Sequence, residues 1–200
     1  MVARSGDCLA GRGVGVGSTG WKIRDGLGEV AGGLAFAGAA AAGAALVGWL
    51  ATLGVLPVFD GADFVATLSG RGEAAVGAWM AAVALVSLAL PAATLAVWGR
   101  DAAVRRALVA YLVVLVVQIS VEMVYSGLFF PDIVVLTGIV FTGYRLMQLR
   151  GARRRFVLAE GPSPRSRAAV RCCLSLGLVF WSANLAFLVF VALPRVVGMV

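Results

Sequence analysis

The sequence predicts an all-α integral membrane protein, a bundle of about five transmembrane helices, and its composition is the first reason. Of 200 residues, 61% are hydrophobic and 14% are charged, whereas soluble domains have roughly 45–50% apolar and about 25% charged residues. The stretches 30–59, 74–99 and 172–194 contain no Asp, Glu, Lys or Arg. Each reaches the roughly 20 residues that a helix needs to cross a bilayer. Transmembrane strands would alternate apolar and polar residues, and these stretches do not.

A fourth apolar stretch, 107–144, is interrupted only by the charges of Glu122 and Asp132. At about 1.5 Å per residue it is too long for one span of ordinary tilt. Gly127 and Pro131 disfavour a continuous helix, so we expect the chain to fold back there. The predicted spans are therefore 31–56, 74–98, 106–126, 131–149 and 172–193.

Basic residues predict the orientation of the bundle. Five spans place the amino terminus, the loop 99–106 and the loop 150–171 on one side, and all of the 17 Lys and Arg residues except Arg71 and Arg195 belong to that side. By the positive-inside rule the amino terminus faces the cytoplasm and the carboxyl terminus faces the outside or the lumen. The net charge of +7 is then explained by topology and by anionic lipid headgroups, without a nucleic-acid partner.

The first 29 residues differ from the rest of the chain. They are rich in glycine and carry basic residues, which predicts a flexible amino-terminal tail ahead of a transmembrane domain at 30–200. The same composition is typical of organelle targeting segments, although Asp7, Asp25 and Glu29 count against that alternative. The tail also contains the spacing G-x-G-x-x-G. It has neither the preceding strand nor the βαβ context of a nucleotide site.

The third predicted span carries the candidate functional residues. Tyr111, Gln118, Glu122 and Tyr125 are 7, 4 and 3 positions apart, so they share one helical face. A carboxylate inside a span is costly and usually points into the bundle or into a wet cavity. We expect Asn184 of the last span to meet Gln118 across the bundle. Two interpretations stay open, a satisfied interhelical hydrogen bond and a functional intramembrane site.

Other residues in the spans have expected structural roles. Ala40, Ala44 and Gly48 recur every four positions and predict close helix packing. Pro91 predicts a kink in the second span, and Pro194 predicts the end of the last one. Arg145 lies near the predicted cytoplasmic end of the fourth span, so we expect it to extend toward the headgroups and to form no direct ion pair with Glu122.

The predicted loop 150–171 is strongly basic and lies beside two membrane entries. We expect its arginines to contact anionic lipid, although a positive-inside signal alone also explains them. These residues are Arg150, Arg153, Arg154, Arg155, Arg165, Arg167 and Arg171.

Missing residue types narrow the function. The chain has no histidine, which excludes His-ligated haem, His-containing metal sites and Ser-His hydrolysis. Its single lysine, Lys22, lies in the predicted tail, so a retinal Schiff base within the bundle is excluded as well. No catalytic constellation is apparent, and we expect no cofactor and no enzymatic activity.

The sequence therefore favours a small multi-pass membrane protein that acts as a non-catalytic subunit or scaffold, with a protein partner or as a homo-oligomer. The alternative is a small carrier or channel, proton-coupled through Glu122.

Overall fold

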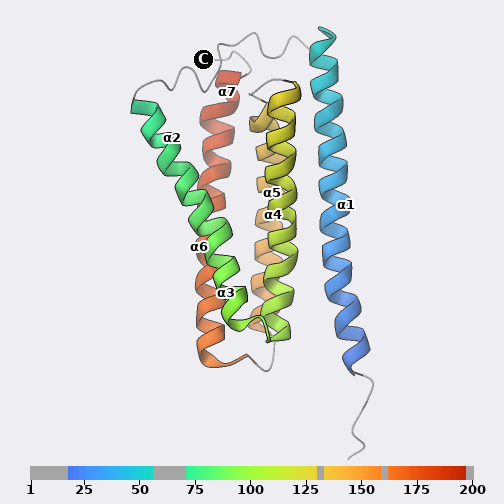
Figure 1. Ribbon diagram of the computed structural model, residues 1–200, viewed down its shortest axis with the longest axis vertical. Helices are drawn as coiled ribbons and strands as arrows, with labels where there is room; N and C mark the ends of the chain where they lie inside the picture. Colours follow the sequence, from blue (N-terminus) through green and yellow to red (C-terminus); the bar gives the residue numbers. More distant parts are fainter. Residues whose placement is uncertain (1–17, 56–70, 130–132, 159–161, 197–200) are drawn as a thin grey trace, which may run out of the picture.

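Long helices run side by side along the computed structural model, which describes residues 18–55, 71–129, 133–158 and 162–196 (Figure 1). Within these ranges the chain is helical and has no strand. The elements, with η marking π-helical segments, are α1 (Ser18–Thr52), α2 (Arg71–Ala82), η2 (Val83–Ala89), α3 (Leu90–Trp98), α4 (Ala102–Leu128), α5 (Ile133–Val157), α6 (Pro164–Phe187), η3 (Leu188–Ala192) and α7 (Leu193–Val196).

Five helices in the described part are long and apolar enough to cross a membrane, which confirms the predicted class of helical, multi-pass membrane bundle at the level of length and composition. These stretches are Leu27–Thr52, Gly77–Trp98, Ala102–Tyr125, Ile133–Val157 and Pro164–Val196.

The first helix begins earlier than expected. α1 starts at Ser18, so residues 18–29, which we assigned to a flexible tail, are helical; residues 1–17 lie outside the described chain. The helix ends where Gly54 adopts a φ of 70°. There the Val55 amide donates to the Leu50 carbonyl and the Gly54 amide to the Ala51 carbonyl. These two bonds form a Schellman motif and satisfy carbonyls in the last turn of the helix. The motif requires a residue in the left-handed region, which glycine adopts without strain.

The prediction that residues 150–171 form a loop is wrong for most of that segment. α5 continues to Val157 and α6 starts at Pro164, so most of that segment is helical. Ser163 caps α6: its hydroxyl accepts a hydrogen bond from the Ser166 amide at 3.2 Å. Proline in the first turn needs no hydrogen-bond donor, which favours the helix start at this position.

Pro91 and Pro194 each follow a π-helical segment. η2 precedes Pro91, and η3 precedes Pro194. Pro194 does not end the last span as expected, because the chain continues in helical form to Val196. Near Pro91, the Thr94 hydroxyl donates to the Leu90 carbonyl at 2.8 Å. A local change to π-helical hydrogen bonding is one way for a helix to accept a residue without an amide hydrogen.

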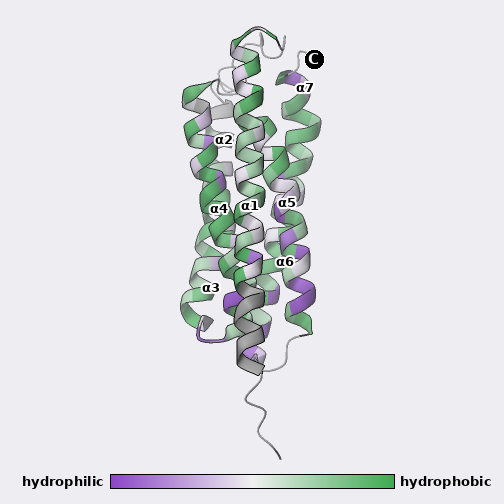
Figure 2. Cartoon of the chain, turned by 90° about the vertical axis from the view of Figure 1, so that its right-hand side faces the viewer, coloured by the Kyte–Doolittle hydropathy of each residue, from purple (hydrophilic) through white to green (hydrophobic). Residues whose placement is uncertain are grey.

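The main cluster of buried hydrophobic residues lies between α4, α5 and α6, toward the end of the bundle where α3 meets α4 and α5 meets α6. Figure 2 shows that hydrophilic residues gather at this end. All seven arginines of the segment 150–171 lie there, on the last turns of α5 and the first turns of α6, while Arg195 lies near the opposite end, in α7. We call the arginine-rich end the basic end.

α1 packs on α4 and α5, with small residues where it comes closest to the neighbouring chain. Gly48, one of the predicted packing positions, is buried against Phe129, and a Cβ atom there would lie 2.6 Å from the Phe129 Cγ. Gly33 is equally close to α4, since a Cβ atom would lie 2.7 Å from the Val114 Cγ2. Ala40 and Ala44 are partly buried. Small residues therefore allow α1 to approach α4 at two points about four turns apart.

Replacing Tyr125 with Phe is expected to destabilise the docking of α1 by about 0.5–1.5 kcal/mol. The Tyr125 hydroxyl donates to the Ala41 carbonyl at 2.9 Å, linking α4 to α1. Tyr144→Phe is the matched control, because in the described chain its ring stacks on Phe36 and its hydroxyl has no hydrogen bond. Thermal unfolding in detergent should give a lower midpoint for Tyr125→Phe alone; equal midpoints for both variants would contradict the role of this bond.

Candidate functional site

The four polar residues of α4 that were predicted to share one face point toward different parts of the bundle. Tyr111 is buried in the core, where its hydroxyl accepts a hydrogen bond from the Trp181 Nε1 at 3.0 Å. Tyr125 faces α1 and donates to the Ala41 carbonyl. Gln118 and Glu122 lie together, with the Gln118 Nε2 donating to the Glu122 Oε1 at 2.6 Å. Of the four residues, only Gln118 and Glu122 therefore belong to the same polar site.

Arg145 completes this site, contrary to the expectation that it extends to the headgroups. It is fully buried, with 0% of its surface exposed, and its Nη2 donates to the Gln118 Oε1. The reason is the length of α5. We ended that span at residue 149, but the helix continues to Val157, so Arg145 lies at its middle and is too deep to reach the surface.

Two aromatic rings enclose the guanidinium of Arg145. Its Cζ lies 4.5 Å from the ring centre of Trp181 and 5.1 Å from that of Tyr111. Such cation–π contacts stabilise a desolvated cation. Two of its nitrogens, Nε and Nη1, are buried and have no hydrogen-bond partner in the described chain. Arg145 and Glu122 are joined through Gln118 rather than by a direct ion pair, and we call these three residues the polar chain.

Asn184 does not bond to Gln118 as we expected. Its Nδ2 donates to the Thr142 Oγ1 of α5 at 3.2 Å, while the amide of Gln118 is used by Glu122 and Arg145. Asn184 and Gln118 nevertheless border the same cavity.

This cavity, which we call the lateral pocket, has a volume of about 470 Å³ and lies between α2, η2, α4, α5, α6 and η3. Its polar residues are Gln118, Glu122 and Asn184, and Trp79 and Trp181 contribute to its lining. The remaining lining residues are Met80, Val83, Ala84, Leu88, Leu115, Ile119, Met123, Val134, Gly138 and Leu188. Ligand sites commonly combine such an apolar lining with a few convergent polar groups.

The lateral pocket opens sideways, between α2 and α4. Met80 of α2 and Met123 of α4, which border the opening, are 60% and 72% exposed. Figure 1 shows α2 leaning away from the bundle toward its amino-terminal end, while α3 stays close to it. α3 packs on α4 and α6, and Trp79 of α2 stacks on Phe180 of α6 with 4.9 Å between ring centres. The pocket therefore lies at the side of the bundle, with exposed residues at its edge.

Both π-helical segments border the lateral pocket, although they are distant in the sequence. η2 contributes Val83, Ala84 and Leu88, and η3 contributes Leu188. Single-turn π segments occur frequently at functional sites, where they change the direction of side chains.

The arginines expected to contact lipid are placed at the basic end. Six of the seven are exposed, and Arg167 is partly buried. Among the described residues no cluster of three or more His, Cys, Asp or Glu side chains is arranged to hold a metal ion.

No protein-family model matches the chain, and no curated protein or solved structure matches it. The function is therefore inferred from the geometry of the site.

Proposed function

We propose that the protein binds a membrane-dissolved amphiphile in the lateral pocket and acts as a small carrier for it. The observation that supports this proposal is the position of Glu122, a carboxylate that borders an otherwise largely apolar cavity with exposed residues, Met80 and Met123, at its edge. A scaffold needs neither a cavity nor a carboxylate at this place, and intramembrane ionisable groups usually mark substrate or ion pathways.

The chemistry of the lateral pocket favours an amine headgroup. Glu122 is the one charged side chain among the described lining residues, since Arg145 lies behind Gln118 and does not border the cavity. Trp79 and Trp181 add aromatic rings, and the combination of aromatic faces with a carboxylate suits an ammonium group. The apolar lining suits an alkyl or isoprenoid tail.

The direction of access follows from the proposed orientation. We place the basic end and the amino terminus in the cytoplasm and the carboxyl terminus outside, by the positive-inside rule. Glu122 is three residues from the end of its span at Tyr125, so roughly 5 Å from that boundary. The ligand would then enter from the leaflet opposite the cytoplasm.

Replacing Glu122 with Gln is expected to weaken binding of a long-chain amine about 10- to 100-fold, because a hydrogen bond to a charged group contributes about 1.5–3 kcal/mol. The full-length protein in lipid nanodiscs is titrated with a nitroxide-labelled long-chain amine, and quenching of tryptophan fluorescence reports binding, since Trp79 and Trp181 line the pocket. The same chain ending in an alcohol or a carboxylic acid should bind more weakly.

Ser120→Ala is the matched control for this titration. Ser120 lies on the same helix and is exposed, and its hydroxyl donates to the Val116 carbonyl of its own helix. The control should bind the amine like the native protein. Equal binding of the three headgroups, or an unchanged affinity in Glu122→Gln, would contradict the proposal.

A subunit or scaffold role is the second candidate, and α1 is the observation that favours it. Much of its apolar surface, including Leu34, Leu46 and Trp49, is not covered by the rest of the described chain. A partner helix or a second copy would fit this face. Purification in mild detergent followed by mass spectrometry tests the idea: a stoichiometric partner supports it, and recovery of the monomer alone contradicts it.

A further inference from the structure

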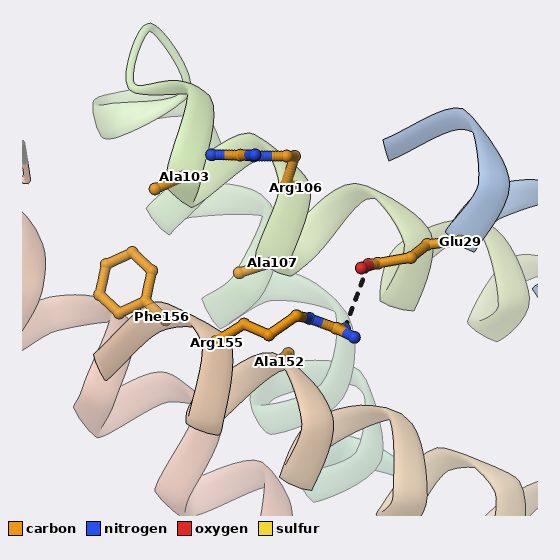
Figure 3. A pocket seen from close by; sticks show the side chains of 7 residues that line it. All are labelled: Glu29, Ala103, Arg106, Ala107, Ala152, Arg155 and Phe156. Carbon is orange, nitrogen blue, oxygen red and sulfur yellow. Dashed lines mark ion pairs between the residues drawn. The ribbon is translucent and has the colours of Figure 1, made fainter. Parts of the chain in front are cut away.

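A second cavity lies at the basic end, between α1, α4 and α5, and is separate from the lateral pocket. Its volume is about 240 Å³. Figure 3 shows its seven lining residues, which are Glu29, Ala103, Arg106, Ala107, Ala152, Arg155 and Phe156. We call it the basic-end cavity.

Two arginines border the basic-end cavity, and they come from different helices. Arg106 belongs to α4 and Arg155 to α5. The Arg106 Nε donates to the Ala102 carbonyl of its own helix at 3.2 Å, which holds that side chain along α4. Guanidinium groups present several donors in one plane and therefore suit phosphate oxygens.

Glu29 occupies one side of this cavity as an internal anion. Its Oε2 lies 3.2 Å from the Arg155 Nη2, and the two side chains are 31% and 58% exposed. Figure 3 shows Arg155 extending from α5 toward Glu29 of α1. An ion pair this exposed contributes little stability, so another anion can displace the Glu29 carboxylate.

The rest of the lining is apolar. Ala103, Ala107 and Ala152 have no polar side-chain atoms, and Phe156 is buried beside them. Ala107, Ala152 and Phe156 are already covered, so the phosphate of a phospholipid would bind at the arginines while its acyl chains stay in the surrounding bilayer. The exposed arginines of α5 and α6 at the same end add general attraction for anionic lipid.

We propose that the basic-end cavity is a specific site for the phosphate of an anionic phospholipid, held by Arg106 and Arg155, with Glu29 as the competing internal anion. This assignment does not depend on a ligand in the lateral pocket. A specific site differs from diffuse attraction in two ways. Loss of Arg106 or Arg155 should weaken lipid binding more than loss of another arginine, and loss of the Glu29 carboxylate should strengthen it.

Native mass spectrometry of the delipidated full-length protein, titrated with phosphatidylglycerol, tests the proposal. Arg106→Gln and Arg155→Gln should each weaken binding about fivefold, in line with the strength of one arginine at an anionic surface. Arg154→Gln is the control, because Arg154 is exposed at the same end and does not line the cavity. Glu29→Gln should tighten binding, since it removes the competing carboxylate and keeps a similar side chain.

Three outcomes would overturn the proposal. The first is an equal loss of binding in Arg154→Gln and in the two cavity variants, which would indicate diffuse attraction. The second is weaker binding in Glu29→Gln while the protein keeps its native melting temperature without lipid. The third is competition by inorganic phosphate, but not by phosphatidylcholine, with the same dependence on Arg106 and Arg155, which would assign the site to free phosphate.

Discussion

Replacing Arg145 with Met is expected to destabilise the protein by about 1–3 kcal/mol, the cost of leaving the buried carbonyl of Gln118 without its hydrogen-bond donor. Arg145 is fully buried at the middle of α5, where it donates to Gln118 and packs between Tyr111 and Trp181. Without it, Gln118 loses a donor and the Glu122 carboxylate loses the cation joined to it through that amide. Thermal unfolding in detergent measures the effect.

A double variant shows how much of the stability lost in Arg145→Met is due to the unbalanced charge of Glu122 and how much to lost packing. Arg145→Met combined with Glu122→Gln removes both charges, so it should recover part of the lost stability. Arg150→Met is the control, because Arg150 is exposed nearer the end of the same helix, and its effect should stay within about 0.5 kcal/mol. A melting temperature of Arg145→Met equal to that of the control would show that the polar chain does not stabilise the bundle.

Replacing Gly48 with Leu is expected to displace α1 from α4 and to cost about 1–3 kcal/mol, the usual range for an overpacked interface. Even a Cβ atom at position 48 would lie 2.6 to 2.9 Å from three ring atoms of Phe129. Gly43→Leu is the matched control on the same helix, because a Cβ atom there meets nothing within 4 Å. The melting temperature should fall for Gly48→Leu and stay nearly unchanged for Gly43→Leu.

The cause of this loss can be checked by making room on the other helix. Gly48→Ala should lower the melting temperature less than Gly48→Leu, and Phe129→Ala combined with Gly48→Ala should remove the clash. If Gly48→Leu and Gly43→Leu were equally stable, close approach of α1 at this position would not contribute to the fold.

The five helices follow from the sequence because their signal is strong. Long stretches without charge occur in a chain that has to satisfy its backbone hydrogen bonds within helices. Helix ends are harder to derive from the sequence. The high charge of the segment 150–171 suggests a loop, but its arginines lie on helical turns of α5 and α6. Ser163 followed by Pro164 is a helix-start signal that locates the beginning of α6.

The candidate site was only partly predictable. Gln118 and Glu122 stand out as polar residues within an apolar span, and both border the lateral pocket. Arg145 was misplaced because its depth depends on the end of α5, which hydropathy alone puts too early. The roles of Trp79 and Trp181 could not be derived, because the sequence does not show whether an aromatic residue in a span packs in the core or faces outward, and only tertiary packing distinguishes these positions.

The proposed carrier function depends most directly on whether the native protein holds an amphiphile in the lateral pocket. The decisive measurement is mass spectrometry of the lipids extracted from the protein after purification in mild detergent. Glu122→Gln removes the carboxylate, and Ala84→Trp adds bulk to the lining; Ser120→Ala is the control. We expect one amine-containing amphiphile to be retained by the native protein and by Ser120→Ala, and to be lost from the other two variants. The same lipid profile in all four proteins would contradict the account.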